Sequence, residues 1–103
     1  EGICVSVAQN GPWRARKEAY VAHLETKPRA SLEVSLADKT HNARAIVNDL
    51  HVHGNALWDR FSGGREGCLW YYRTLADAFV RLVPGPAANR LEAVVAEMET
   101  LAG

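Results

Sequence analysis

Several signals that mark common protein classes are missing from this sequence of 103 residues. No stretch approaches the ~20 continuous apolar residues that a membrane-spanning helix requires. Lysine and arginine together number 12, as do aspartate and glutamate, so the net charge is zero. This balance gives no electrostatic case for nucleic acid or an anionic membrane as a partner. The two cysteines, Cys4 and Cys68, form no CxxC or zinc-finger spacing. One disulfide between them stays open, but two reduced thiols in a cytoplasmic protein are the favoured reading.

What the chain does contain is ordinary globular composition with helical spacing. Hydrophobic residues make up 48% of the chain and charged residues 23%. A chain of this length buries one modest core, so we expect a single helical domain over 1–103. Apolar residues recur three and four apart, and glycine and proline mark the breaks. The pattern predicts an all-α fold of about five helices, over 3–9, 12–25, 31–53, 65–83 and 88–101, with a helical turn or two over 56–61.

The helix expected over 31–53 is the most informative element, although it could begin as early as Pro28. Gly54 is its natural C-cap. At 100° per residue, one stripe faces the core, formed by Leu32, Leu36, Ala43, Val47 and Leu50. The opposite side carries Asp38, Asn42, Ala45 and Asp49. We expect this helix to be central and to pack against the one over 65–83. In the helix over 12–25, the expected solvated side consists of Arg14, Arg16, Lys17 and Glu18.

Asp38 and Asn42 are the polar pair with the clearest chemical potential. They are four residues apart, so they stack one helical turn from each other. A carboxylate and an amide placed in this way can hold a divalent cation and hydrogen-bond a ligand beside it. The spacing alone favours the simpler reading, in which both side chains face water.

The segment from Leu36 to Arg44, LADKTHNAR, resembles the ADKxHN-type segment of HD-domain metal-dependent phosphohydrolases. It is most similar to that of the bacterial guanosine tetraphosphate (ppGpp) pyrophosphohydrolases and their small stand-alone relatives. The segments PWRARK, WDRF and WYY, which begin at Pro12, Trp58 and Trp70, resemble that group's neighbouring segments in the same order. The likeness covers about residues 12–80.

This resemblance implies a fold, an activity and two site residues. The fold would be the C-terminal portion of an HD-domain-like helical bundle. The activity would be metal-dependent hydrolysis of a nucleotide pyrophosphate or phosphate ester such as ppGpp. The family's Asp supplies the last ligand of a divalent metal, Mn in the complete members, and this role falls on Asp38. The Asn one turn later lines the nucleotide site, and this role falls on Asn42.

The sequence departs from the family's pattern in its metal ligands. The family also uses an early His and a His-Asp dyad, whereas this chain has no His-Asp dipeptide and no histidine before His23. His51 and His53 are two apart, so on a helix they diverge and do not share an ion. Thr40 stands where the family usually has leucine. Because these ligands are missing, we expect either a partial HD-type domain that lacks the upstream ligand helices or a remnant that no longer hydrolyses anything.

Two functions therefore remain as hypotheses. The first is an HD-type phosphohydrolase that binds a nucleotide and is inactive as this isolated chain. The second is a non-enzymatic helical interaction or dimerisation module that needs no metal. We also expect a homodimer, because a partial domain exposes apolar surface. The expected contact residues are Ile3, Val5, Val7 and the aromatic run from Trp70 to Tyr72.

Overall fold

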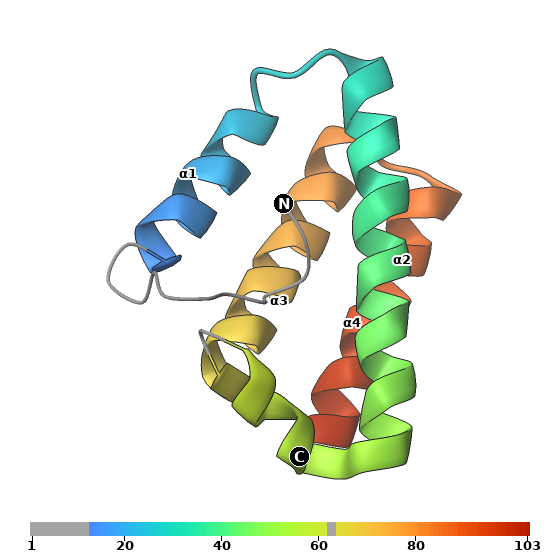
Figure 1. Cartoon of the computed structure of the whole chain (residues 1–103). Helices are drawn as coiled ribbons and strands as arrows, with labels where there is room; N and C mark the ends of the chain where they lie inside the picture. Colours follow the sequence, from blue (N-terminus) through green and yellow to red (C-terminus); the bar gives the residue numbers. More distant parts are fainter. Residues whose placement is uncertain (1–12, 62–63) are drawn as a thin grey trace.

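The computed structural model describes residues 13–61 and 64–103, and within these ranges every regular element is a helix (Figure 1). The elements, in chain order, are α1 (Trp13–Leu24), α2 (Arg29–His53), the 3-10 helix η1 (Gly54–Arg60), α3 (Gly64–Leu82) and α4 (Pro86–Ala102). The all-α prediction is therefore confirmed, with four α-helices in the described part. The helix expected over 3–9 lies outside the described residues. Of the helices described, none combines the length and the apolar character that crossing a bilayer demands.

The helix α2 packs mainly against α4 and touches α3 only slightly. The expected pairing of α2 with the helix over 65–83 is therefore wrong. α4 presents a continuous apolar stripe of Leu91, Val94, Val95 and Met98, all buried, and this stripe serves as the seam for α2. α3 lies between α1 and α4 and packs on both, while η1 closes the lower end of the bundle in Figure 1.

Glycine and proline set the ends of the helices as the sequence indicates. Gly54 follows α2 with a φ of 64°, and its N–H donates to the carbonyl of Leu50. This left-handed conformation favours glycine because it has no Cβ. At the other end, α2 begins at Arg29 after Pro28 rather than at Ser31. Pro86 opens α4, where its missing N–H costs no hydrogen bond.

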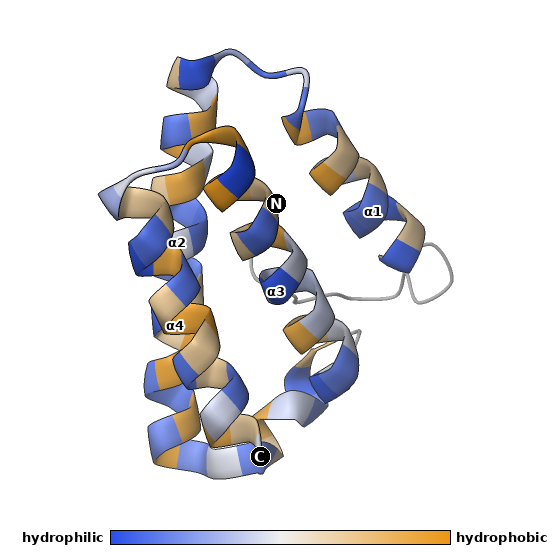
Figure 2. Ribbon diagram, turned by 180° about the vertical axis from the view of Figure 1, so that it is seen from behind, coloured by the Kyte–Doolittle hydropathy of each residue, from blue (hydrophilic) through white to orange (hydrophobic). Residues whose placement is uncertain are grey.

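The core-facing stripe of α2 contains a lysine. Its buried residues are Leu32, Leu36, Lys39, Ala43, Ile46, Val47 and Leu50. The apolar members confirm the predicted stripe. Lys17 of α1 is also buried, so its assignment to the solvated side was wrong, whereas Arg14, Arg16 and Glu18 are exposed as predicted. In Figure 2, hydrophilic and hydrophobic residues are interspersed along each helix, as expected for helices with one buried and one exposed side.

Two of the three residues in the aromatic run of α3 are buried in the core. Tyr71 and Tyr72 are completely buried, and their rings meet edge to face with centroids 5.3 Å apart. Trp70 is half-buried, and the guanidinium carbon of Arg14 lies 3.8 Å from its ring centroid. Tyr71 and Tyr72 therefore do not form the exposed dimer surface that the sequence suggested, whereas Trp70 keeps part of its surface exposed. The aromatic run instead joins α3 to α1.

Candidate functional site

Asp38 and Asn42 lie one turn apart in the middle of α2. The Asp38 carboxylate is at the surface, with 58% of its side chain exposed. Asn42 is half-buried. The structure thus leaves both side chains on the side of α2 that does not pack against the core, and the Asp38 carboxylate is accessible to a ligand in solution.

Lys39 places a positive charge directly beneath this carboxylate. Its Nζ is 3.9 Å from Asp38 Oδ2, although only 1% of the lysine side chain is exposed. The same Nζ lies 5.0 Å from the ring centroid of Tyr20 in α1 and 5.9 Å from that of Tyr71 in α3. A cation held near aromatic faces is stabilised by the ring quadrupole, and this effect grows as water is excluded.

Lys17 brings a second ammonium group to the same tyrosine. Its Nζ is 4.8 Å from the ring centroid of Tyr71, and the residue is 2% exposed. Two ammonium groups, one from α1 and one from α2, therefore lie against one ring of α3. Removing an ammonium group from water is costly unless it gains such interactions. The cluster of Lys17, Lys39, Tyr20 and Tyr71, which we call the lysine–tyrosine cluster, holds two buried positive charges, and that of Lys39 lies beside Asp38.

The burial of both lysines could have been predicted from their spacing in the sequence, although not from their hydropathy. Lys39 lies between Leu36 and Ala43 at steps of three and four residues, the spacing of the core stripe. Lys17 falls in the same way between Trp13 and Tyr20. A lysine at a core position of an otherwise apolar stripe is unusual. It is therefore a better marker of a site than a lysine on a charged face.

The described residues do not form a metal site by themselves. In the part of the chain that the structure covers, no group of three or more histidine, cysteine, aspartate or glutamate side chains gathers around one point. The Nε2 of His51 is 3.4 Å from Glu97 Oε2, which ties that imidazole to α4. Asp38 contributes one carboxylate with an ammonium group beside it. This donor set does not fit a transition metal, which requires several nitrogen or carboxylate ligands.

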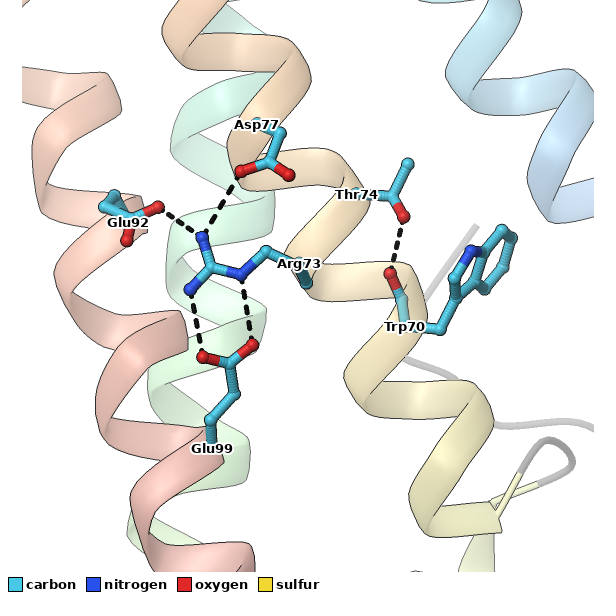
Figure 3. Close-up of polar contacts among 6 residues, drawn as sticks. All are labelled: Trp70, Arg73, Thr74, Asp77, Glu92 and Glu99. Carbon is cyan, nitrogen blue, oxygen red and sulfur yellow. Dashed lines mark hydrogen bonds and ion pairs between the residues drawn. The ribbon is translucent and has the colours of Figure 1, made fainter.

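The densest polar cluster elsewhere in the described helices is structural. Arg73 of α3 donates two hydrogen bonds of 3.0 Å to the Glu99 carboxylate of α4, and it also pairs with Glu92 and Asp77 (Figure 3). The hydrogen bonds to Glu99 and then Glu92 raise the pKa of the Arg73 guanidinium above its ordinary value. The Arg73 hydrogen bond lowers the pKa of Glu99. With its donors directed at carboxylates, Arg73 ties α3 to α4 and leaves little capacity for a ligand.

Neither a scan against models of known protein families nor a search of curated proteins gives a match for this chain. The candidate site is therefore defined by the local segment around Asp38 and by the charges that the fold brings beside it.

Proposed function

We propose that this chain supplies the Asp38–Asn42 side of an HD-type phosphohydrolase site that binds a nucleotide pyrophosphate or phosphate ester such as ppGpp. The observation that carries this proposal is the stacking of an exposed carboxylate over buried cations. Asp38 lies at the surface, and Lys39 lies 3.9 Å from it in the lysine–tyrosine cluster. The Lys39 ammonium group offsets part of the negative charge of Asp38, so a phosphate near this carboxylate would meet less repulsion there.

Each residue of the site has a separate role in this proposal. Asp38 would contribute one carboxylate oxygen toward a divalent ion, which the described residues do not hold by themselves. Asn42, one turn later, would hydrogen-bond the nucleotide. Lys39 would act on the phosphate through its electrostatic field, because its ammonium group is buried beside Asp38, and Lys17 would add to the positive charge of the lysine–tyrosine cluster. Because the described residues supply one metal ligand, the remaining ligands would have to come from outside them.

The first test uses Mn²⁺ as a paramagnetic probe in solution NMR. We expect substoichiometric Mn²⁺ to broaden amide resonances around Asp38 and Asn42 first, and Asp38→Asn to abolish this selectivity. Asp49→Asn is the matched control, because Asp49 is an exposed carboxylate on the same helix and on the same predicted side. Equal broadening around Asp38 and Asp49 would mean that Asp38 is an ordinary surface carboxylate, and it would remove the basis of the proposal.

The second test is titration with ppGpp. We expect shifts centred on 38–42, with weaker binding in Asn42→Ala and Lys39→Met. Guanosine without phosphates is the control ligand, and it should bind at least about tenfold more weakly if the cations recognise phosphate. Shifts of equal size with guanosine and ppGpp would argue against a phosphate site.

The second candidate function, a non-enzymatic interaction module, is favoured by a separate observation. Two neighbouring cavities line the side of α2 that faces the start of α4, away from Asp38. If the chain binds neither Mn²⁺ nor ppGpp but binds a protein partner at these cavities, it is an interaction module.

A further inference from the structure

A groove runs between α2 and the start of α4. It consists of two cavities of about 360 and 270 Å³, which both include Glu33, Leu36 and Ala87 in their walls. The shared wall makes them one elongated depression, which we call the α2–α4 groove. It extends along α2 from Arg29 to Arg44. At 1.5 Å per residue this is roughly 22 Å, the length of six or seven residues of extended chain.

The α2–α4 groove is separate from the Asp38 site. Leu36, Thr40 and Arg44 line the groove and project toward α4. Asp38 lies two residues from both Leu36 and Thr40, so its side chain projects about 160° away from each around the helix axis. Binding in the groove therefore does not depend on the function proposed for Asp38 and Asn42.

The floor of the groove is apolar and its rim is basic. Leu36, Ala37 and Ala87 provide apolar surface, and Val83 and the turn through Pro84 and Pro86 continue it. The charged lining residues are three arginines, Arg29, Arg44 and Arg90, against one glutamate. That glutamate, Glu33, is paired with Arg29 at 3.2 Å. At the end formed by Arg44 and Arg90, Glu97 pairs with Arg44, so the unbalanced positive charge there is that of Arg90.

The two basic residues at this end differ in how they are held. Arg44 forms a long ion pair of 3.6 Å with Glu97 of α4, and about half of each side chain is exposed. Arg90 is exposed and forms no ion pair with another residue in the described part of the chain. His41 lines the same cavity and is exposed. An incoming carboxylate can therefore pair with Arg90 without first displacing an internal partner.

We infer that the α2–α4 groove binds a short acidic peptide segment of a partner protein. An apolar side chain of the segment occupies the cavity over Leu36 and Ala37, and flanking carboxylates pair with Arg90 and Arg44. The length of the groove and its apolar floor favour a peptide over a small anion, because a small anion would contact the basic end and leave the floor uncovered. The charge excess favours an acidic segment over a neutral or basic one.

The experiment is an NMR titration of the whole chain with synthetic peptides. The probe is the acetylated, amidated hexapeptide EELLEE, and the controls are QQLLQQ, which lacks the charge, and EEAAEE, which lacks the apolar anchors. We expect EELLEE to shift the amides of Leu36, His41 and the first turn of α4, and both controls to bind at least about fivefold more weakly. Equal binding of all three peptides would overturn the inference, as would equal shifts with the small dicarboxylate glutarate.

Matched variants separate this groove from general surface charge. We expect Arg90→Ala to weaken EELLEE binding about fivefold or more, and Ala37→Leu to block it by filling the cavity. Arg16→Ala and Ala22→Leu are the controls, because both residues are exposed on α1 and should leave binding unchanged. An equal loss in Arg16→Ala would show that only net charge matters. If the groove amides instead shift with protein concentration and ignore EELLEE, the groove is a contact between copies of this chain and the inference is wrong.

Discussion

Lys39 occupies a position at which its neighbours in the core stripe of α2 are apolar. Leu36 and Ala43 lie one turn before and after it and are buried, as is the lysine stem. A buried charge often stabilises a fold less than an apolar residue of similar volume, because desolvation offsets what its interactions contribute. The presence of ammonium groups at both Lys39 and Lys17 therefore suggests a role other than stability, and the proposal of a phosphate site gives them one.

We expect Lys39→Met to change the free energy of unfolding by about 1 kcal/mol or less in either direction, because the lost contacts with Asp38 and Tyr20 and the relieved desolvation of the charge oppose each other. Methionine preserves the stem in the core and removes the cost of burying the charge. Urea denaturation followed by circular dichroism measures the change. Leu36→Ala serves as the comparison, and it should destabilise by about 2–5 kcal/mol because it leaves a cavity. A loss of several kcal/mol in Lys39→Met would show that the ammonium group is structural.

Arg73 is the opposite case, in which a polar residue ties two helices together. We expect Arg73→Met to destabilise the chain by about 1–3 kcal/mol, because Glu99 and Glu92 would lose their partner at a partly buried position. Chemical denaturation at neutral pH measures this loss. Arg81→Met is the control, because the Arg81–Glu25 pair is more than half exposed and should contribute about 1 kcal/mol or less. Similar losses in the two variants would contradict the structural role of Arg73.

The same cluster predicts a dependence of stability on pH. Arg73 lowers the pKa of Glu99 in the folded state. The Arg73–Glu99 pair therefore stabilises the fold fully above the ordinary glutamate pKa of about 4.3. This stabilisation is lost as the pH falls through the lower pKa that Glu99 has in the folded state. We expect the original chain to lose more stability than Arg73→Met between about pH 5 and pH 3. Thermal unfolding across this range tests the difference, and parallel curves would argue against it.

At the scale of the element, the sequence predicted the helices well because glycine and proline mark their ends. The ends of α2 and α3 and the start of α4 fall within two residues of the expected positions. The pairing of α2 with α4 was not predictable in the same way. Both α3 and α4 carry apolar residues at helical spacing, so the sequence pattern does not say which of them covers α2. The choice depends on α3, whose buried residues also face α1. A stripe identifies the buried side of a helix, but it does not identify the helix that covers it.

In the candidate site, too, the features within one helix were predictable and the contacts between helices were not. The turn from Asp38 to Asn42 was predictable, since a helix of this length places residues four apart on one side. The lysine–tyrosine cluster was not, because it joins Lys17 and Tyr20 of α1 to Lys39 of α2 and Tyr71 of α3. These contacts are tertiary, and charge alone had assigned Lys17 to the solvent. The α2–α4 groove was missed for the same reason.

The end of α2 gives a prediction at this scale. Gly54 has a φ of 64°, and a Cβ added to it would contact nothing within 4 Å. The cost of Gly54→Ala therefore comes from backbone strain alone, and because ψ is −154° we expect a loss of about 1–3 kcal/mol. Asn48→Ala on the exposed side of the same helix is the control, and it should be neutral or slightly stabilising because alanine has the higher helix propensity. Thermal denaturation of both variants measures the difference. An unchanged midpoint for Gly54→Ala would mean that the α2–η1 junction readily adopts another conformation.

The described surface of the whole molecule offers little apolar area for self-association. The large apolar residues exposed on it are Val34, Val52 and Val80, and these are isolated single residues. With Tyr71 and Tyr72 buried, the main candidates for the expected homodimer are Ile3, Val5 and Val7. We expect a dimer in sedimentation equilibrium that becomes a monomer when all three are changed to serine. The control, Val34→Ser with Val52→Ser, should remain dimeric. A monomer at high concentration in the original chain would contradict the prediction.

The last prediction concerns turnover by the whole chain. We expect the purified 103-residue chain to show no Mn²⁺-dependent hydrolysis of ppGpp or of simple phosphodiesters. Asp38 is the residue that can be assigned to a metal, and an exposed carboxylate with an ammonium group 3.9 Å away holds a divalent ion only weakly. Without several ligands to fix the ion, no bound water reaches the low pKa that makes it a nucleophile at neutral pH.

The assay follows phosphate and pyrophosphate release with and without Mn²⁺, and an unrelated HD-type hydrolase serves as the positive control. If a second polypeptide supplies the missing histidine ligands, activity should appear in the mixture. Asp38→Ala should then abolish it, because a ligand is lost. Asn42→Ala should mainly raise KM, because it weakens binding of the nucleotide. Robust turnover by the isolated chain that is lost in Asp38→Ala would mean that the ligands have been assigned to the wrong residues. Turnover unaffected by Asp38→Ala would place the chemistry elsewhere in the chain.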